Sequence, residues 1–320
     1  MTSSGATWQE KYGPQMDLSF TGPLSFSHLP YVRCLEAENE NELFDIALLG
    51  MPFDTGVTHR PGARFGPHAI RSGSRREFEW AGYSLSWENN PYEQGSRIID
   101  CGDVPVSPFD NVLAIDQMEV AYSTLLNRPV ANPPEKSSSL DTWPGFPGTT
   151  TKQSRINHGT YFHVAHEEGL ISNHSIHAGI RGKLGGLVDL EIDASTGFQL
   201  ISADDIDNLG IPEIIRHVRT RVGNMPVYLS FDIDVIDPGL APASHRDTRS
   251  GRMDYSRGET YPQRTSRLNF IGADLVEVAP AYDHAEITGI AAASLVHDFL
   301  SVMLADEPPK HDRVVLKNEF

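Results

Sequence analysis

The stretch VYLSFDID, residues 227–234, carries the pattern on which the fold prediction rests. Its apolar residues end at two aspartates, Asp232 and Asp234, as is typical of a parallel strand that is buried on both faces. Residues 175–182 and 269–278 have the same form and also end in polar or charged residues, and a fourth run, residues 45–50, ends in glycine. Polar groups are therefore expected to collect where the strands end.

Helical segments separate these runs. Residues 107–127 begin with Ser107 as the expected N-cap and Pro108 in the first turn. Their apolar positions recur at helical spacing, namely Ala114, Met118, Ala121, Tyr122 and Leu125. Residues 211–223 and 287–303 have similar patterns. Alternating strands and helices predict a doubly wound α/β sheet whose ligands bind at the carboxyl ends of the strands.

The two aspartates are a candidate metal site. Side chains two positions apart on a strand share a face, so Asp232 and Asp234 are expected to present two carboxylates to one point. Like charges this close call for a compensating cation. Two alternatives remain open at this point. The aspartates cap the next turn, or they form an Asp-x-Asp site for a nucleotide sugar with Mn²⁺.

Four ordered blocks of sequence carry a family resemblance. They are GMPFDTGVTHRPGARFGPHAIR (50–71), NHGTYF (157–162), SFDIDVIDPGLAP (230–242) and GADLVEVAPAYD (272–283). Together they resemble the ureohydrolases, the arginase and agmatinase group. The segments DCGDVPVSPFDN (100–111) and RPGARFGP (60–67) are most similar to agmatinase-type members. The resemblance extends from about Phe44 to Met303.

The resemblance implies a three-layer, arginase-like α/β fold with a central, mostly parallel sheet. It also implies two manganese ions bridged by hydroxide, which hydrolyse a guanidino compound to urea and an amine, as in polyamine biosynthesis. By position, Asp141, Asp232 and Asp234 correspond to metal ligands of the family. His158 corresponds to the histidine that passes protons to the leaving amine, and Glu277 to the acid that pairs with the substrate guanidinium.

The chain departs from the family pattern before Asp141. The family has a Gly-Gly-Asp-His segment and an Asp-x-His pair, but residues 127–140 are too short to contain the strands that carry them, and Ser137 and Ser139 occupy the pair's positions. We therefore expect two central strands and three of six metal ligands to be missing. The alternative function is that of a non-catalytic ureohydrolase-like subunit, or the product of a mis-joined or decayed gene.

A second departure follows Ala243. The family continues with Gly-Thr-Gly-Thr-Pro-Glu-x-Gly-Gly-Trp-Thr, whereas residues 244–255 are SHRDTRSGRMDY. The codons of Met253, Asp254 and Tyr255, read one base later, give Trp followed by Thr or Ile twice. The codons of His245 to Arg252 permit Thr-Gly-Thr-Pro-Glu-Ala-Gly-Gly in the same register. This pattern predicts that residues 244–266 were translated out of frame.

Composition restricts the partners of the chain. It has 320 residues and a net charge of −17, with an isoelectric point near 5.1. This charge disfavours nucleic acid and suits a small cationic guanidino substrate. No apolar run approaches the ~18 residues of a membrane span, and no secretory signal pattern is present, so we expect no membrane partner and a cytoplasmic location.

The remaining predictions concern organisation. We expect an N-terminal arm (1–42), a ureohydrolase-like domain (43–305, disrupted at about 127–155 and 244–266), a C-terminal tail (306–320) and assembly as a homo-oligomer. Cys34 and Cys101 are too few for a disulfide framework and match no zinc motif, so both are expected to be inert. Arg60, Arg64 and Arg71 are expected to order their loop, before a helix that starts near residue 67, or to form a subunit contact.

Overall fold

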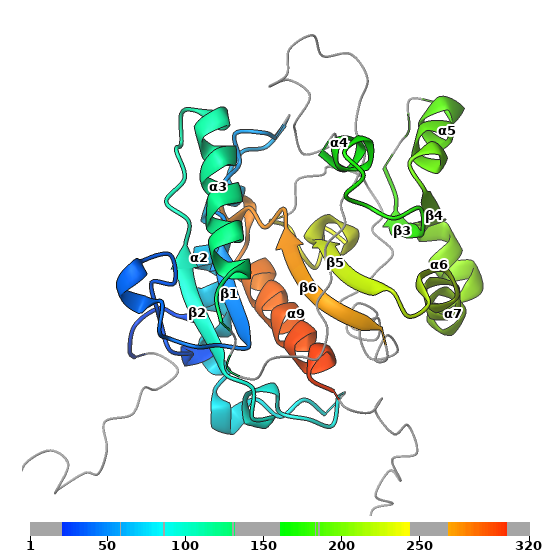
Figure 1. Ribbon diagram of the computed structural model, residues 1–320. Helices are drawn as coiled ribbons and strands as arrows, with labels where there is room; N and C mark the ends of the chain where they lie inside the picture. The colour runs from blue at the N-terminus through cyan, green and yellow to red at the C-terminus, as the bar shows by residue number, and fades with distance from the viewer. Residues whose placement is uncertain are drawn as a thin grey trace, which may run out of the picture.

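The computed structural model describes residues 21–57, 59–85, 87–129, 131, 161–182, 184, 186–243 and 268–305. Its strands form three parallel pairs, which follow one another across the molecule in Figure 1 with β5–β6 in the middle. The strands are β1 (Ile46–Gly50), β2 (Ile98–Asp103), β3 (Ser175–Ile180), β4 (Phe198–Ser202), β5 (Pro226–Asp232) and β6 (Asn269–Val276). Strands β1, β3, β5 and β6 were predicted from their apolar runs, whereas β2 and β4 were not.

Helices alternate with the strands, as an α/β fold requires. They are α2 (Gly66–Gly73), α3 (Asn111–Leu126), α4 (Tyr161–Glu167), α5 (Leu187–Ser195), α6 (Ala203–Leu209), α7 (Ile211–Val222) and α9 (Ile287–Met303). Helices α7 and α9 match their predicted spans. Among the described residues, no helix has the length and apolar character needed to cross a membrane.

Helix α3 begins later than predicted. Its N-cap is Asp110, whose carboxylate accepts hydrogen bonds from the backbone N–H groups of Val112 and Leu113 at 3.0 and 3.1 Å. The hydroxyl of Ser107, the predicted cap, instead accepts the N–H of Asp110 in the preceding turn. A carboxylate satisfies the first free N–H groups and also interacts favourably with the helix dipole, so Asp110 is the stronger cap.

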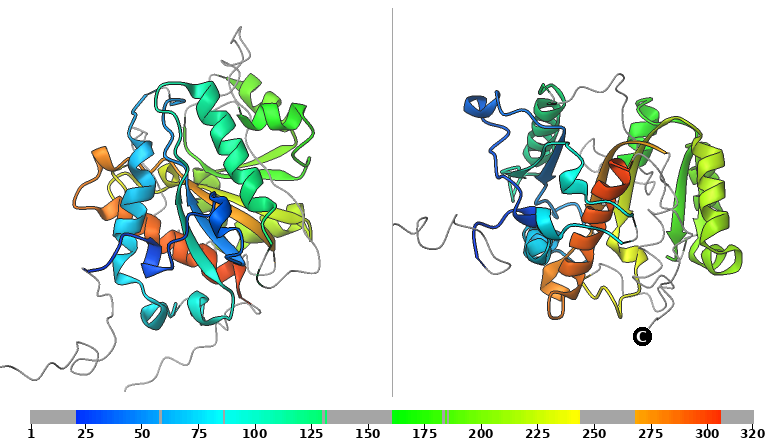
Figure 2. Two further views of the ribbon diagram at one scale, coloured as in Figure 1. Left: turned by 60° about the vertical axis from the view of Figure 1, so that its left-hand side comes forward. Right: turned by 90° about the horizontal axis from the view of Figure 1, so that it is seen from below.

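One of the hydrophobic core clusters lies between β5–β6 and α9. Leu295 and Phe299 of α9 pack with apolar side chains on one face of the strand pair, among them Leu229, Phe231 and Leu275. On its other side α9 meets α2 at close range, because a Cβ on Gly73 would lie 2.3 Å from the carbonyl oxygen of Gly289. Figure 2 shows α2 and α9 side by side. This packing fixes the strand pair that carries the candidate site.

The segment before β1 is attached to β2. Val32 N–H donates to the carbonyl of Asp100 at 2.9 Å, and Asp100 N–H donates to the carbonyl of Pro30 at 3.0 Å. These bonds bring Cys34 and Cys101 to a Cα–Cα distance of 5.2 Å, and the two form a disulfide. The expectation that both cysteines are inert is therefore wrong. The contact joins residues 67 positions apart and depends on the path of the chain, which cysteine spacing does not reveal.

Candidate active site

The carboxyl ends of β5 and β6 bring two predicted site residues to one edge. The strands pair in parallel register, with Ser230 opposite Asp274 and Asp232 opposite Val276. Glu277 comes directly after Val276, so it follows β6 where Asp232 ends β5. Neighbouring parallel strands thus place acidic residues from two distant parts of the sequence at the same edge, as α/β folds do at their ligand sites.

The aspartate pair is not part of a single strand. Strand β5 ends at Asp232, and residues Ile233–Val235 form a short 3-10 turn. The strand premise of the sequence prediction is therefore wrong for Asp234. The carboxylate of Asp232 accepts the backbone N–H of Asp234 at 2.8 Å, which is the capping role left open above. A carboxylate has further acceptor positions, so this bond does not use up its capacity for a cation.

The two aspartates also differ in surroundings. Asp232 is exposed, whereas Asp234 is buried with 7% of its surface accessible. Arg181, just after β3, donates from Nε to the backbone carbonyl of Asp234 at 2.8 Å, and its Nη2 contacts the same oxygen. The sequence reasoning did not identify Arg181, although a charged residue at the end of a predicted strand was a usable signal. Arg181 ties the turn after β5 to the end of β3.

Glu277 has an unusual backbone. Its φ is +66°, in the left-handed region. A residue other than glycine typically pays about 1–3 kcal/mol of conformational free energy there. The next residues, Val278 and Ala279, are buried, and Ala279 N–H donates to the carbonyl of Ala243 at 2.9 Å. The buried residues that follow the bend, with the Ala279–Ala243 backbone bond, therefore hold Glu277 in place. Backbone strain of this kind is common at functional sites.

The loop after β1 packs against the segment that follows Glu277. Tyr282 donates from its hydroxyl to the carbonyl of Pro61 at 3.1 Å, and the guanidinium of Arg60 lies 5.2 Å from the Tyr282 ring centroid. Gly66 is needed at this contact, because a Cβ there would lie 2.7 Å from the carbonyl oxygen of Val278. The loops after β1 and β6 thus form one layer at the strand ends.

The same loop is organised by an ion pair. The buried carboxylate of Asp54 accepts Arg64 Nε at 2.6 Å and the backbone N–H of Gly62 at 2.7 Å. Burial alone would raise the pKa of Asp54, but these bonds and the charge of Arg64 lower it below its usual value. Arg64 therefore orders the loop from within, as one of the two predicted roles requires. Helix α2 starts at Gly66, close to the predicted position.

The described residues contain only part of the predicted ligand set. Asp141 and His158 lie outside them. Within the described ranges, no group of three or more His, Cys, Asp or Glu side chains is arranged to hold a metal ion. Asp232 and Asp234 supply the oxygen donors that Mn²⁺ accepts, but two carboxylates do not make a complete site.

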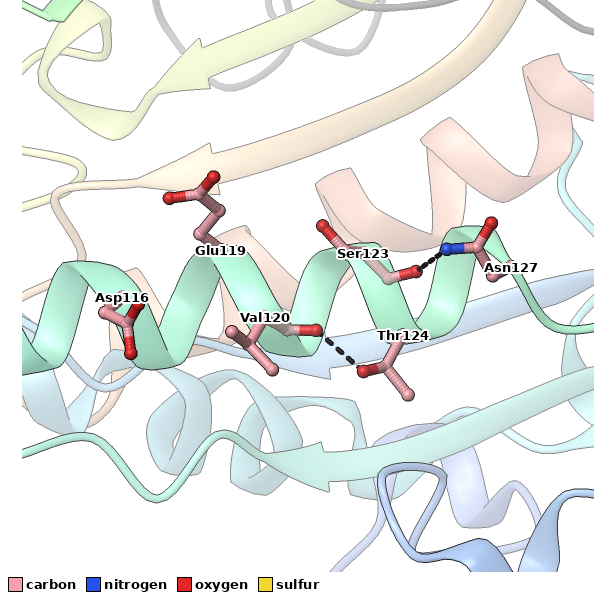
Figure 3. Close-up of a pocket in the computed structure, with 6 residues that line it drawn as sticks. All are labelled: Asp116, Glu119, Val120, Ser123, Thr124 and Asn127. Carbon is pink, nitrogen blue, oxygen red and sulfur yellow. Dashed lines mark hydrogen bonds between the residues drawn. The ribbon is translucent and has the colours of Figure 1, made fainter.

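A pocket elsewhere contains no predicted site residue. It lies along α3 and its C-cap, as Figure 3 shows. Its lining is Asp116, Glu119, Val120, Ser123, Thr124 and Asn127. Glu119 and Val120 are exposed, so the pocket is a shallow surface feature of one helix.

The fold and site define an α/β protein with acidic residues gathered at parallel strand ends. Comparison with known proteins gives the family. The Arginase family model matches residues 44–132 and 140–301, so the chain belongs to the arginase family. It is an agmatinase-like hydrolase of the ureohydrolase type within that family.

Individual relatives agree with this assignment. The chain is 41% identical to "Putative agmatinase 1" of Schizosaccharomyces pombe, over 91% of this chain and 84% of the relative. Among solved structures, proclavaminate amidino hydrolase from Streptomyces clavuligerus is 28% identical with a TM-score of 0.77, covering 91% of this chain and all of that one. A hypothetical agmatinase from Burkholderia thailandensis is 27% identical with a TM-score of 0.75, covering 92% and 93%. The arginase-like α/β fold predicted from the motifs is confirmed.

The match has a gap within the chain. The family model is interrupted between residues 132 and 140. The alignment with the fission yeast protein has 335 positions. It covers 91% of this 320-residue chain, which is about 291 residues. About 44 positions of the alignment therefore have no counterpart in this chain. The interruption falls within residues 127–140, where the motifs predict that a ligand segment is missing.

Proposed function

We propose that this enzyme acts on a small cationic guanidino compound of the agmatine type, releasing urea and an amine, with manganese as its metal. The observation that supports this most directly is the placement of Asp232 and Glu277 at the ends of neighbouring strands in an arginase-family chain. The net charge of −17 also favours a cationic substrate.

Each acidic residue has a proposed role. Asp232 and Asp234 would hold manganese through their carboxylate oxygens, together with Asp141. When bound, the metal pair supplies an activated water at neutral pH. Glu277 binds the substrate guanidinium, because a carboxylate and a guanidinium form two parallel hydrogen bonds. His158 passes a proton to the nitrogen of the leaving amine, a task suited to a group that titrates near neutrality.

A second candidate starts from the interruption of the family match between residues 132 and 140. In addition, about 44 positions of the alignment with the fission yeast relative have no counterpart in this chain. A non-catalytic subunit that keeps the fold and the oligomer contacts of the family fits these two observations. The homo-oligomeric state and the cytoplasmic location remain proposals for both candidates.

Metal content and urea release test the proposal together. The purified full chain, incubated with Mn²⁺ and desalted, is expected to retain manganese by elemental analysis and to release urea from agmatine. Asp232→Asn should lower the retained manganese, whereas Glu277→Gln should keep the metal and lose urea release. Asp204→Asn, at an exposed position in α6, is the matched control. A folded chain that holds no manganese and releases no urea would support the subunit instead.

A further inference from the structure

Asp274 joins the two strands that carry the candidate site. It lies on β6 opposite Ser230 of β5. Ser230 Oγ donates to Oδ1 of Asp274 at 2.7 Å, and Tyr228 Oη donates to Oδ2 at 3.0 Å. Each carboxylate oxygen therefore accepts a hydroxyl from a different position along β5.

These contacts lie close to the acidic residues of the site. Ser230 is two residues before Asp232, and Asp274 is three residues before Glu277. Side chains alternate along a strand, so Tyr228, Ser230 and Asp232 share one face of β5. The other face packs through Leu229 and Phe231 against the core with α9. The pair is thus held by apolar packing on one face and by Asp274 on the other.

The surroundings of Asp274 show what a carboxylate contributes here. Burial raises its pKa, although the bonds from Ser230 and Tyr228 act in the opposite direction. Burial is the main cause that raises the pKa of Tyr122, a residue of α3, and the negative charge of Asp274 raises it further. The Tyr122 phenol is therefore another neighbour of the Asp274 carboxylate. An apolar side chain would join the strands at a lower desolvation cost. Two directed hydrogen bonds instead fix the position of β5 along β6.

We propose that Asp274 is a positioning residue that sets the end of β5, with Asp232, against the end of β6, with Glu277. This inference rests on the proposed function, since it assigns Asp274 to the same site. Asp274 acts through Ser230 and Tyr228 and touches neither metal nor substrate. Groups that hydrogen-bond directly to metal ligands typically change metal affinity about 10- to 100-fold when they are replaced, so the indirect role of Asp274 should give an effect near the lower end of this range.

The first test follows the strand ends without any metal. Hydrogen–deuterium exchange of the full chain is measured for peptides that cover residues 229–236, 272–278 and 287–303. Asp274→Val removes both acceptors at similar volume, and we expect exchange at 229–236 to accelerate about tenfold. Asp274→Asn keeps one acceptor oxygen and should restore most of the protection. Asp193→Asn, a buried carboxylate of α5 paired with His177, is the matched control.

The second test measures Mn²⁺ affinity by electron paramagnetic resonance of the free ion. Asp274→Val is expected to weaken binding about tenfold, with Asp274→Asn nearer to the unmodified chain. Unchanged exchange at 229–236 in Asp274→Val would overturn the inference. So would equal acceleration at 287–303, because Asp274 would then be a general stabiliser of the fold. Unchanged affinity despite faster local exchange also counts against it.

The two arms separate this inference from the function on which it rests. If the unmodified chain binds no Mn²⁺, the manganese proposal fails. The positioning role for a metal site fails with it, while the exchange data still show whether Asp274 fixes the strand ends. If the unmodified chain binds Mn²⁺ and Asp274→Val behaves like it in both arms, only the role of Asp274 is overturned.

Discussion

Arg71 and Asp100 form a buried ion pair at the junction of α2 and β2. Arg71 donates from Nε and Nη2 to the two carboxylate oxygens of Asp100 at 2.8 and 2.9 Å, and from Nη1 to Asp103 at 2.7 Å. Burial disfavours the charge on Arg71, but these partners outweigh it and raise the pKa of the guanidinium. Arg71 therefore fastens helix α2 to strand β2, a contact that differs from the predicted ordering of its loop.

Replacing Arg71 should be costly. Arg71→Leu would leave the carboxylate of Asp100, whose residue is 0% exposed, without its charge partner. Removing one member of a buried pair typically costs about 3–5 kcal/mol of unfolding free energy, which chemical denaturation would measure. Arg216→Leu, which breaks an exposed pair with Glu213, should leave the unfolding free energy nearly unchanged. Equal effects of the two substitutions would contradict the buried-pair interpretation.

A second buried network joins Glu77, Ser27, Tyr92 and His297. Ser27 donates to Glu77 Oε2 at 2.9 Å, Tyr92 donates to Ser27 at 2.8 Å, and Tyr92 Oη lies 3.1 Å from His297 Nδ1. The Tyr92 hydroxyl thus lies between the Ser27 hydroxyl and the imidazole of His297. The network holds Ser27 at a φ of +47°. Hydrogen bonds thus stabilise a strained turn of the N-terminal segment.

Glu77 and His297 have opposite effects on how the stability of the fold depends on pH, and in the unmodified chain the two effects partly cancel. Burial raises the pKa of Glu77 from 4.5 to about 7 and lowers that of His297 from 6.5 to about 4. The folded state binds the Glu77 proton more tightly than the unfolded state, so this group makes stability fall as the pH rises from 4.5 to 7. His297 makes stability rise between pH 4 and 6.5. The two effects oppose each other over the shared range.

Removing either group should reveal the effect of the other on the pH dependence of stability. In Glu77→Gln, stability should rise between pH 4 and 6.5 by up to about 3 kcal/mol because only His297 remains. In His297→Gln, it should fall between pH 4.5 and 7. Denaturant unfolding at several pH values measures both slopes, and the unmodified chain is the control. Slopes of the same sign in the two variants would show that these groups do not control the pH dependence.

At the scale of elements, the disulfide fastens the N-terminal segment to β2. It closes a sequence separation of 67 residues between Cys34 and Cys101. Loss of such a bond typically lowers the unfolding free energy by about 2–4 kcal/mol, mostly because the unfolded chain gains conformational entropy. Cys34→Ser, or a reductant added to the unmodified chain, should therefore lower the melting temperature. The Cys34→Ser/Cys101→Ser double variant should not respond to reductant, and a response there would place the effect elsewhere.

At the scale of the whole molecule, the predicted loss of a ligand segment can be tested by restoring it. The described strands form three separate pairs, and the family match is interrupted at residues 133–139. Inserting the corresponding segment of the fission yeast relative between residues 132 and 140 should raise manganese retention, because it would supply the Asp and His ligands that the motifs lack. A scrambled segment of equal length is the control. Equal retention in both chimeras would contradict the missing-ligand hypothesis.

The nucleotide sequence tests the second departure. If residues 244–266 were translated out of frame, the codons read one base later should spell Thr-Gly-Thr-Pro-Glu before the Trp that Met253 forces. Any other string at these codons would reject the hypothesis. The stretch lies outside the described residues, so the gene, rather than the fold, decides this point.

The sequence predicted the α/β class, four of the six described strands, the spans of α7 and α9, and the family. These features depend on local apolar periodicity or on contiguous motifs, which are visible without a fold. It also indicated that Asp232 and Glu277 lie at the ends of two strands, because both follow apolar runs. It placed Asp232 and Asp234 on one strand in error, since periodicity does not show where a strand gives way to a 3-10 turn.

Only the tertiary structure decided the contacts between distant segments. The pairing of Cys34 with Cys101, of Arg71 with Asp100 and of Asp274 with Ser230 each joins residues at least 29 positions apart. Such contacts depend on which strands are neighbours and in which register they pair, and a one-residue change of register would turn each side chain to the other face. The sequence alone therefore determined which chemical groups the chain offers at its strand ends, and the packing of β5, β6 and α9 decided which of them meet.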